Sequence, residues 1–188
     1  MASVVSSQSD YDTISVKEAK RQLRIASEDF DKEVEDAIRE AIDYCERITG
    51  RTLRTAVGRI DNYPNWCEAV KGFQWQPVID VSAVSYYDAD GNSQSVSSSY
   101  WRLVASTDGP AKLEFDADYT LPVIDVRSDA IQVTYTTGYA DIDDVPPAAK
   151  RAIKTMLTVF WGDLAPQAIA KWEQSAIDTL RLLEWGAF

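Results

Sequence analysis

Apolar positions follow a helical period at both ends of the chain and a strand period in the middle. Over the region 28–50 they recur every three or four residues, at Phe30, Val34, Ile38, Ala41, Cys45 and Ile48. This spacing predicts one buried face of a long helix that ends at Gly50. A shorter helix is expected from about Val16 to Leu23, because Ser15 and Glu18 have the spacing of a capping box.

Between about Arg54 and Gly138 the period falls to two, and β-branched and aromatic residues dominate. We expect strands over 55–63, 78–87, 93–97, 100–104, 111–115 and 131–137. The Asp90-Gly91 pair predicts a hairpin turn between the second and third strands. Residues 116–129 contain Leu121-Pro122 and several acids, and are expected to form a loop.

The helical period returns near Asp144, where Pro146 and Pro147 suit a first turn. A last helix is expected over about 168–183, with Ile169, Trp172, Ala176, Leu180 and Leu183 in register. The order of elements predicts an α+β fold, in which N- and C-terminal helices form a four-helix bundle with an inserted antiparallel β-subdomain. The expected parts are a flexible N-terminal arm (1–14), the first half of the helical part (15–53), the β-subdomain (54–140), the second half of the helical part (141–181) and a C-terminal partner-binding tail (182–188).

Composition narrows the classes of function. The 188 residues include 19 basic and 30 acidic ones, for a net charge of −11, which argues against a protein that holds nucleic acid through a basic surface. The absence of histidine excludes Ser-His-Asp and Cys-His catalysis and removes the commonest zinc ligand. The two cysteines suit a reducing compartment, and we expect no signal peptide and no membrane span.

Two local patterns resemble chemical sites. Asp88 and Asp90 begin like a calcium loop, but Gly91 comes fourth, where a β-turn needs it, so a turn is expected. Asp116 and Asp118, with Glu114, are the residue types of an acid–base hydrolase, although carboxylates at a strand end are usually solvated.

Aromatic residues leave a further alternative open. The chain has six tryptophans and nine tyrosines, which are the residues of a carbohydrate-binding surface, although most of them lie at positions compatible with a core. The usual motifs for nucleotides, zinc and hydrolase nucleophiles do not occur, so we expect no cofactor and no metal.

Charge on the helices suggests an interface between copies. The long helix is acidic, and the third helix has a small basic cluster; both are ordinarily solvated, but they are complementary on one chain. The candidate residues are Glu33, Asp36, Glu40 and Asp43 on the first side and Lys150, Arg151 and Lys154 on the second.

The C-terminal segment is apolar, whereas a free terminus is normally polar. Its apolar residues are Leu182, Leu183, Trp185 and Phe188. They either fold back onto the core or insert into a partner, as aromatic anchors do.

Several stretches, in order, resemble the head–tail connector (adaptor or head-completion) proteins of tailed bacteriophages. They are the opening 14–24, the helix end 44–53, the hairpin start 84–91, the strand 131–139, and 145–153 leading into Phe160-Trp161. The resemblance lies in the order of these stretches along the chain. The last helix and the tail match only in character.

The resemblance implies a structural virion protein and not an enzyme. Such proteins form a ring of about twelve copies below the portal protein, extend the DNA channel and dock the stopper or tail-completion protein. DNA is expected to pass without specific binding, no membrane is involved, and assembly takes place in the host cytoplasm. In this family the C-terminal segment reaches into the portal, which would assign that role to Leu182, Leu183, Trp185 and Phe188. A stopper or tail-completion protein is the nearest alternative.

Overall fold

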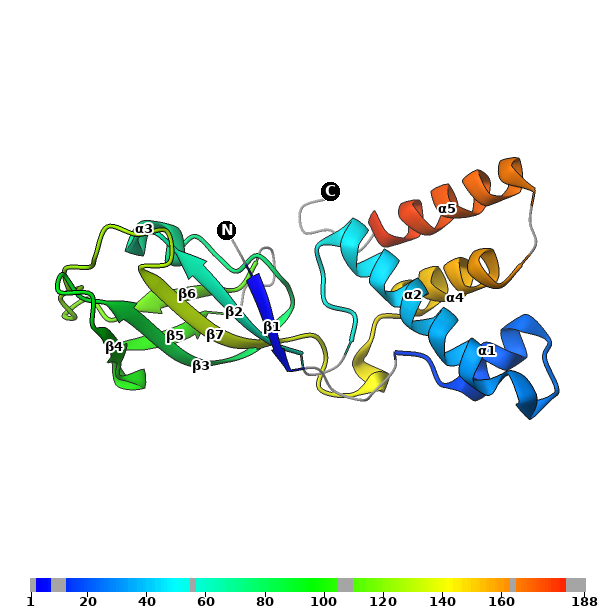
Figure 1. Cartoon of the computed structure of the whole chain (residues 1–188), viewed down its shortest axis with the longest axis horizontal. Coiled ribbons are helices and arrows are strands. Elements are labelled where there is room, and N and C mark those ends of the chain that lie inside the picture. Colours follow the sequence, from blue (N-terminus) through cyan, green and yellow to red (C-terminus); the bar gives the residue numbers. More distant parts are fainter. Residues whose placement is uncertain (1–2, 8–12, 55–56, 105–109, 163–164, 182–188) are drawn as a thin grey trace. The chain divides into compact units, whose positions relative to one another are not determined.

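The chain has an α+β fold, and its elements gather in two units (Figure 1). This computed structural model describes residues 3–7, 13–54, 57–104, 110–162 and 165–181. The β unit takes its residues from 3–7 and 57–138, and the helical unit takes its residues from 13–54 and 139–181. The chain therefore passes from the helical unit to the β unit after residue 54 and returns to the helical unit at residue 139.

The helical unit contains α1 (Val16–Leu23), α2 (Asp31–Thr49), α4 (Pro147–Trp161) and α5 (Pro166–Arg181). The Ser15 hydroxyl accepts the backbone N–H of Glu18 at 3.3 Å, so the predicted cap of α1 is confirmed. Gly50 ends α2 with φ +63°, a left-handed conformation that glycine adopts without a steric penalty. All four helices contribute to one hydrophobic core.

The ends of the predicted α2 stripe are more exposed than expected. Val34, Ile38 and Cys45 are fully buried, but Phe30 is 48% exposed and Ile48 is 37% exposed. Phe30 lies in a 3₁₀ turn (Glu28–Phe30) before α2, where the α-helical period does not apply, and it meets Trp161 edge to face with ring centroids 6.3 Å apart.

The predicted stripe of α5 is likewise only partly buried. Ala176 and Leu180 are buried, whereas Trp172 is 44% exposed. This helix contacts chiefly α4 and, less extensively, α2. The described residues of α5 therefore pack against other helices along one narrow face only. The buried stripe on this helix is narrower than the sequence periodicity predicted.

The β unit is built on a five-stranded antiparallel sheet in the order β1-β2-β7-β3-β4. These strands are β1 (Ser3–Ser7), β2 (Val57–Tyr63), β7 (Ile131–Thr137), β3 (Val78–Tyr87) and β4 (Ser93–Val96), and a second, two-stranded sheet pairs β5 (Trp101–Val104) with β6 (Lys112–Phe115). Alternate residues of β2 and β7 are buried, as the period of two predicts. Side chains of both sheets and of the short α3 (Trp66–Ala69) share one core.

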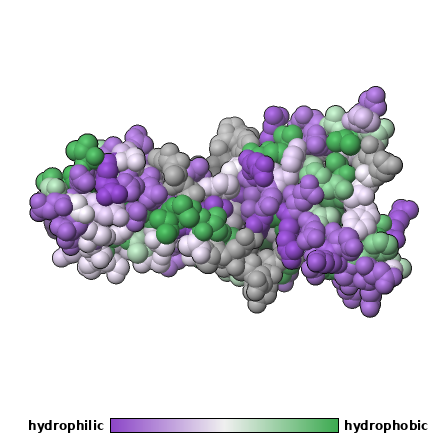
Figure 2. Space-filling view, in the orientation of Figure 1, coloured by the Kyte–Doolittle hydropathy of each residue, from purple (hydrophilic) through white to green (hydrophobic). Residues whose placement is uncertain are grey.

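The N-terminal arm is not free where the structure describes it. Residues 3–7 form β1, an edge strand in which Val4 pairs with Ile60 and Val5 with Arg59. Val4 and Val5 are about half exposed, and Figure 2 shows a hydrophobic patch at the position of β1. The Ser-rich, polar sequence of this segment predicted a flexible arm. In the structure, the edge of β2 provides the hydrogen-bonding partners that order residues 3–7.

The Asp88 segment is a turn, as predicted. One Asp88 carboxylate oxygen accepts the backbone N–H groups of Asp90 at 3.1 Å and Asn92 at 2.9 Å. Gly91 has φ +79°, which explains why glycine occupies that position. Asp88 therefore stabilises its own hairpin between β3 and β4.

Candidate interaction surfaces

The acidic residues of α2 form one stripe opposite the core. A helix turns once every 3.6 residues, so steps of three and four keep the same direction. Val34 and Ile38 lie on the buried face of the helix, and the acidic side chains lie on the face that points away from them. The stripe consists of Glu33, Asp36, Glu40 and Asp43, all exposed.

Two members of this acidic stripe already have cationic partners in the chain. Asp36 pairs with Arg39 at 3.0 Å, and Asp43 pairs with Arg54. Glu33 and Glu40 have no ion pair among the described residues. The stripe therefore offers less free negative charge to a partner than its sequence suggested.

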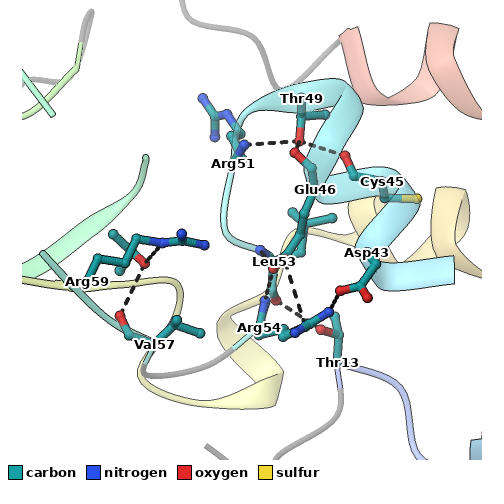
Figure 3. A network of polar contacts seen from close by, with 11 residues as sticks. Thr13, Asp43, Cys45, Glu46, Thr49, Arg51, Leu53, Arg54, Val57 and Arg59 are labelled. Carbon is teal, nitrogen blue, oxygen red and sulfur yellow. Dashed lines mark hydrogen bonds and ion pairs between the residues drawn. The ribbon is translucent and has the colours of Figure 1, made fainter. Parts of the chain in front are cut away.

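A neighbouring acid that looked equally solvated in the sequence has a structural role. Glu46 is 7% exposed, and its Oε1 accepts the backbone N–H groups of Leu53 at 2.7 Å and Arg54 at 3.0 Å (Figure 3). Thr13 donates its hydroxyl to the Leu53 carbonyl at 2.9 Å. This network fixes the segment that follows α2, and no pattern in the sequence pointed to it.

The basic cluster lies on the outer side of α4. Lys150 is partly exposed and Arg151 is exposed, and neither has an ion pair among the described residues. Lys154 instead pairs with Glu18 of α1. Only two of the three predicted cations are therefore free to meet a partner.

These cations border an open depression of about 710 Å³ formed by α1, α4 and α5. Gln22 contributes from α1 and Thr179 from α5. The α4 residues that line it are Pro147, Ala148, Lys150, Arg151, Lys154 and Thr155. Hydrocarbon and cationic groups occur side by side, which suits a partner that presents apolar side chains flanked by carboxylates. We call this feature the α4 depression.

The loop between β6 and β7 exposes apolar side chains that the sequence analysis did not single out. Val123 is 78% exposed and Val126 is 101% exposed, and Leu121 is 39% exposed. Figure 2 shows hydrophobic surface at the end of the β unit where this loop runs in Figure 1. We call Leu121, Val123 and Val126 the apolar tip.

The residues between these side chains anchor the loop. The Trp66 indole N–H donates to the Pro122 carbonyl at 3.0 Å, and Asp125 donates its backbone N–H to the Tyr87 carbonyl at 3.0 Å. Arg127 lies over the Tyr87 ring, 3.9 Å from its centroid, and binds Asp129 through two hydrogen bonds. The loop therefore presents its tip from fixed points of attachment.

The carboxylates proposed for acid–base catalysis lie on the surface. Glu114 pairs with Arg102 across β5 and β6 at 2.9 Å. Asp116 and Asp118 are both exposed. A catalytic acid–base pair needs two different environments, with one carboxyl group in an apolar pocket, and neither residue lies in such a pocket. Within the described residues, no cluster of three or more acids or cysteines could hold a metal ion.

The aromatic residues of the β unit mostly pack against one another. Trp66 meets Tyr86 and Phe115 with ring centroids 5.7 Å and 5.4 Å apart. Tyr100 is exposed but stacks on Tyr119 at 4.5 Å. Trp66, Tyr86, Phe115 and Tyr119 thus pack against the core of the β unit, and none of them lines the depressions described on the helical unit.

The β unit also buries a polar cluster beneath β2 and β7. Asp61 is fully buried, and one of its carboxylate oxygens accepts the hydroxyl groups of Tyr135 at 2.6 Å and Tyr63 at 3.3 Å. Burial, and then Asp61, raise the pKa of both tyrosines above the ordinary range. The tyrosines therefore remain protonated donors, which suits a structural role.

Leu182, Leu183, Trp185 and Phe188 lie outside the described residues. In the described part of the chain, none of the helices has the length and hydrophobicity to cross a membrane.

Comparison with known proteins identifies structures of similar fold but no matching family. No family model matches the chain, and no curated protein matches it. Among solved structures, a chain from the neck of an empty gene transfer agent particle, computed with C6 symmetry, has a TM-score of 0.75 and 20% identity over 96% of this chain and 95% of that one. A chain from the virion of the native particle has a TM-score of 0.70 at 20% identity, covering 93% of this chain and 94% of that one.

A chain from the neck of the native particle, computed with C12 symmetry, has a TM-score of 0.69 and 19% identity, covering 94% of each chain. These similarities extend over nearly the whole length of both partners, so both units take part in them. The protein thus has the fold of chains that occur in the neck and virion of gene transfer agent particles.

Proposed function

We propose that the protein is a head–tail connector of a tailed bacteriophage or a phage-like particle. The observation that carries this proposal is the match in fold, over 96% of this chain and 95% of the other, to a chain of a particle neck. The order of the sequence motifs supports it independently, because those motifs extend from the first helix to α4. The protein would act as a structural component without catalytic residues or cofactors.

We further propose that the protein forms a ring of about twelve copies below the portal. One similar neck was computed with C12 symmetry and another with C6 symmetry. A ring needs two different, complementary faces on each copy. The cations of α4 point away from the core that the helices share and supply one such face. The acidic stripe on α2 is the complement that its sequence suggested, although two of its four acids are already paired within the chain.

The charge of the chain agrees with a role around a DNA channel. With a net charge of −11, the ring would repel DNA phosphates, which favours passage over binding. The stopper or tail would dock on the side of the ring that faces away from the portal. A stopper or tail-completion protein would differ from this assignment only in the partners that it touches.

The experiment that tests the proposal is quantitative peptide mass spectrometry on purified particles. We expect about twelve copies per particle, in near-equal amount to the portal subunit. Absence from particles that contain portal protein would refute the assignment. A copy number far below that of the portal would contradict the ring.

The tail requires a separate experiment. We propose that Leu182, Leu183, Trp185 and Phe188 bind the portal, because large apolar and aromatic side chains fill partner pockets. Deletion of residues 182–188 is expected to leave a folded protein that no longer binds portal in a pull-down assay. Loss of the far-ultraviolet circular dichroism signal would instead identify the segment as part of the core.

A further inference from the structure

We infer that the apolar tip of one copy docks in the α4 depression of the next copy. The tip is Leu121, Val123 and Val126 on the β unit, and the depression lies on the helical unit. This inference rests on the proposed ring and specifies which surfaces form it.

The tip has the properties of a preorganised ligand. Val123 and Val126 expose most or all of their surface to water, although apolar groups gain free energy when they leave it. The bonds from Trp66 to the Pro122 carbonyl and from Asp125 to the Tyr87 carbonyl fix the loop on either side of Val123. A fixed loop loses little conformational entropy on binding, so its apolar groups contribute more of their burial to affinity.

The loop that carries the tip also contains unpaired carboxylates. Asp116, Asp118 and Asp125 have no ion pair among the described residues. Arg127 is the only cation of the loop between β6 and β7, and Asp129 already binds it. The loop that carries the tip therefore combines exposed apolar side chains with unpaired negative charge.

The α4 depression has the complementary character. Pro147 and Ala148 offer hydrocarbon surface, and Lys150 and Arg151 offer cations that no described acid neutralises. Lys154 contributes less, because Glu18 already pairs with it. Apolar contact in the centre and charge pairs at the border are the usual anatomy of a specific interface.

The acidic stripe of α2 is a weaker occupant for the same depression. Asp36 and Asp43 are already paired within the chain, and the stripe itself contains no apolar side chain. It would meet the cations but leave the surface of Pro147 and Ala148 uncovered. The loop between β6 and β7 offers apolar side chains to Pro147 and Ala148 and carboxylates to Lys150 and Arg151.

A charge-swap series in assembled particles tests the inference. The variant Lys150→Asp with Arg151→Asp should reduce the copy number per particle by about tenfold or more, because charge reversal replaces attraction with repulsion. Adding Asp116→Lys with Asp118→Lys should restore it. Adding Glu33→Lys with Glu40→Lys, the matched swap on α2, should not. Thermal unfolding of each variant checks that these surface changes leave the fold intact.

Photo-crosslinking gives an independent readout of the same contact. A benzophenone amino acid at position 126 in assembled particles should crosslink to peptides that contain 147–155 of a neighbouring copy, so that the product runs as a covalent dimer of the chain. The same probe at position 40, on α2, should not reach that segment.

Four outcomes would overturn the inference: undiminished assembly of the first variant, rescue by the α2 swap alone, failure of both swaps to rescue, or crosslinks from position 126 that avoid 147–155. Crosslinks to a different particle protein would identify the tip as the surface for that partner. In each of these cases a wild-type copy number of about twelve would leave the connector assignment standing. Absence of the wild-type chain from particles would refute the connector itself.

Discussion

Asp61 is a carboxylate that the β unit buries completely, and two tyrosine hydroxyls satisfy one of its oxygens. The two bonds differ in length, 2.6 Å to Tyr135 and 3.3 Å to Tyr63, although both partners are fully buried tyrosines. A hydrogen bond to a charged group is worth more when it is short and well formed. The pair therefore offers a comparison in which only the hydroxyl group changes.

We expect Tyr135→Phe to lower the free energy of unfolding by about 1.5–3 kcal/mol, because it removes the short bond to a buried acid. The matched change, Tyr63→Phe, should lower it by less than half as much. Urea denaturation of both variants measures the difference. Equal losses, or a larger loss for Tyr63→Phe, would contradict the role assigned to the short bond.

Cys45 and Cys67 differ in exposure, and the difference predicts their reactivity. Burial raises the pKa of the Cys45 thiol from 9.0 to about 12, and Cys67 is exposed. We expect one thiol per native chain to react with a thiol reagent at pH 8, and two after denaturation. Reaction of both thiols in the native protein would contradict the burial of Cys45.

The same shift predicts how stability depends on pH. A group whose pKa is raised on folding stabilises the folded state fully below the pKa of the unfolded chain and loses that effect as the pH rises through the folded value. For Cys45 this interval runs from about 9 to about 12, and the raised pKa values of Tyr63 and Tyr135 act in the same direction. We therefore expect the free energy of unfolding to fall between pH 8 and pH 10.5, as urea denaturation at the two values would show. An increase would contradict the prediction.

At the scale of elements, the exit from α2 depends on one side chain. Glu46 accepts two backbone N–H groups at 2.7 Å and 3.0 Å, and its second oxygen lies 3.7 Å from Arg54 Nε (Figure 3). Without Glu46 the buried N–H group of Leu53 loses this acceptor. An unsatisfied buried donor is costly, because it has given up water without replacing it.

We expect Glu46→Ala to destabilise the protein by about 2–3 kcal/mol, and Glu46→Gln by about half as much, because the amide oxygen still accepts a bond. Glu40→Ala is the control on the same helix. Its side chain is exposed without an ion pair among the described residues, so its effect should stay within about 0.5 kcal/mol. A similar loss for Glu40→Ala would mean that helix propensity, and not the capping bonds, explains the result.

At the scale of the whole molecule, the described core residues form two groups, one in each unit. Ile153 belongs to the helical core and Ile131 to the β core, and both are fully buried. A cavity in one core should therefore weaken that unit first.

We expect Ile153→Ala, at a cost of about 2–5 kcal/mol, to speed hydrogen exchange in peptides from α2 and α4 and to leave β2 and β7 little changed. Ile131→Ala should produce the reverse pattern. Exchange followed by mass spectrometry measures both. Equal acceleration throughout the chain in either variant would show that the two units unfold together.

Most elements and their order could be predicted from the sequence, whereas β1 and the short α3 were not predicted. Hydrophobic periods of three to four residues predicted helices, and a period of two predicted strands. With Ser15, Gly50 and Gly91 as boundary signals, the predicted elements lie within a few residues of those observed. This succeeded because periodicity and capping act between near neighbours in the chain. The α+β class followed from the order of these segments.

Which side chains are free to act depends on tertiary contacts. Glu46 and Asp43 looked alike in the sequence, yet one is buried under the backbone of residues 53–54 and the other pairs with Arg54 at the surface. Likewise β1 became a strand because β2 offered it an edge, and Val123 and Val126 became exposed because their neighbours were anchored. These outcomes depend on contacts between residues distant in the chain, which periodicity does not encode.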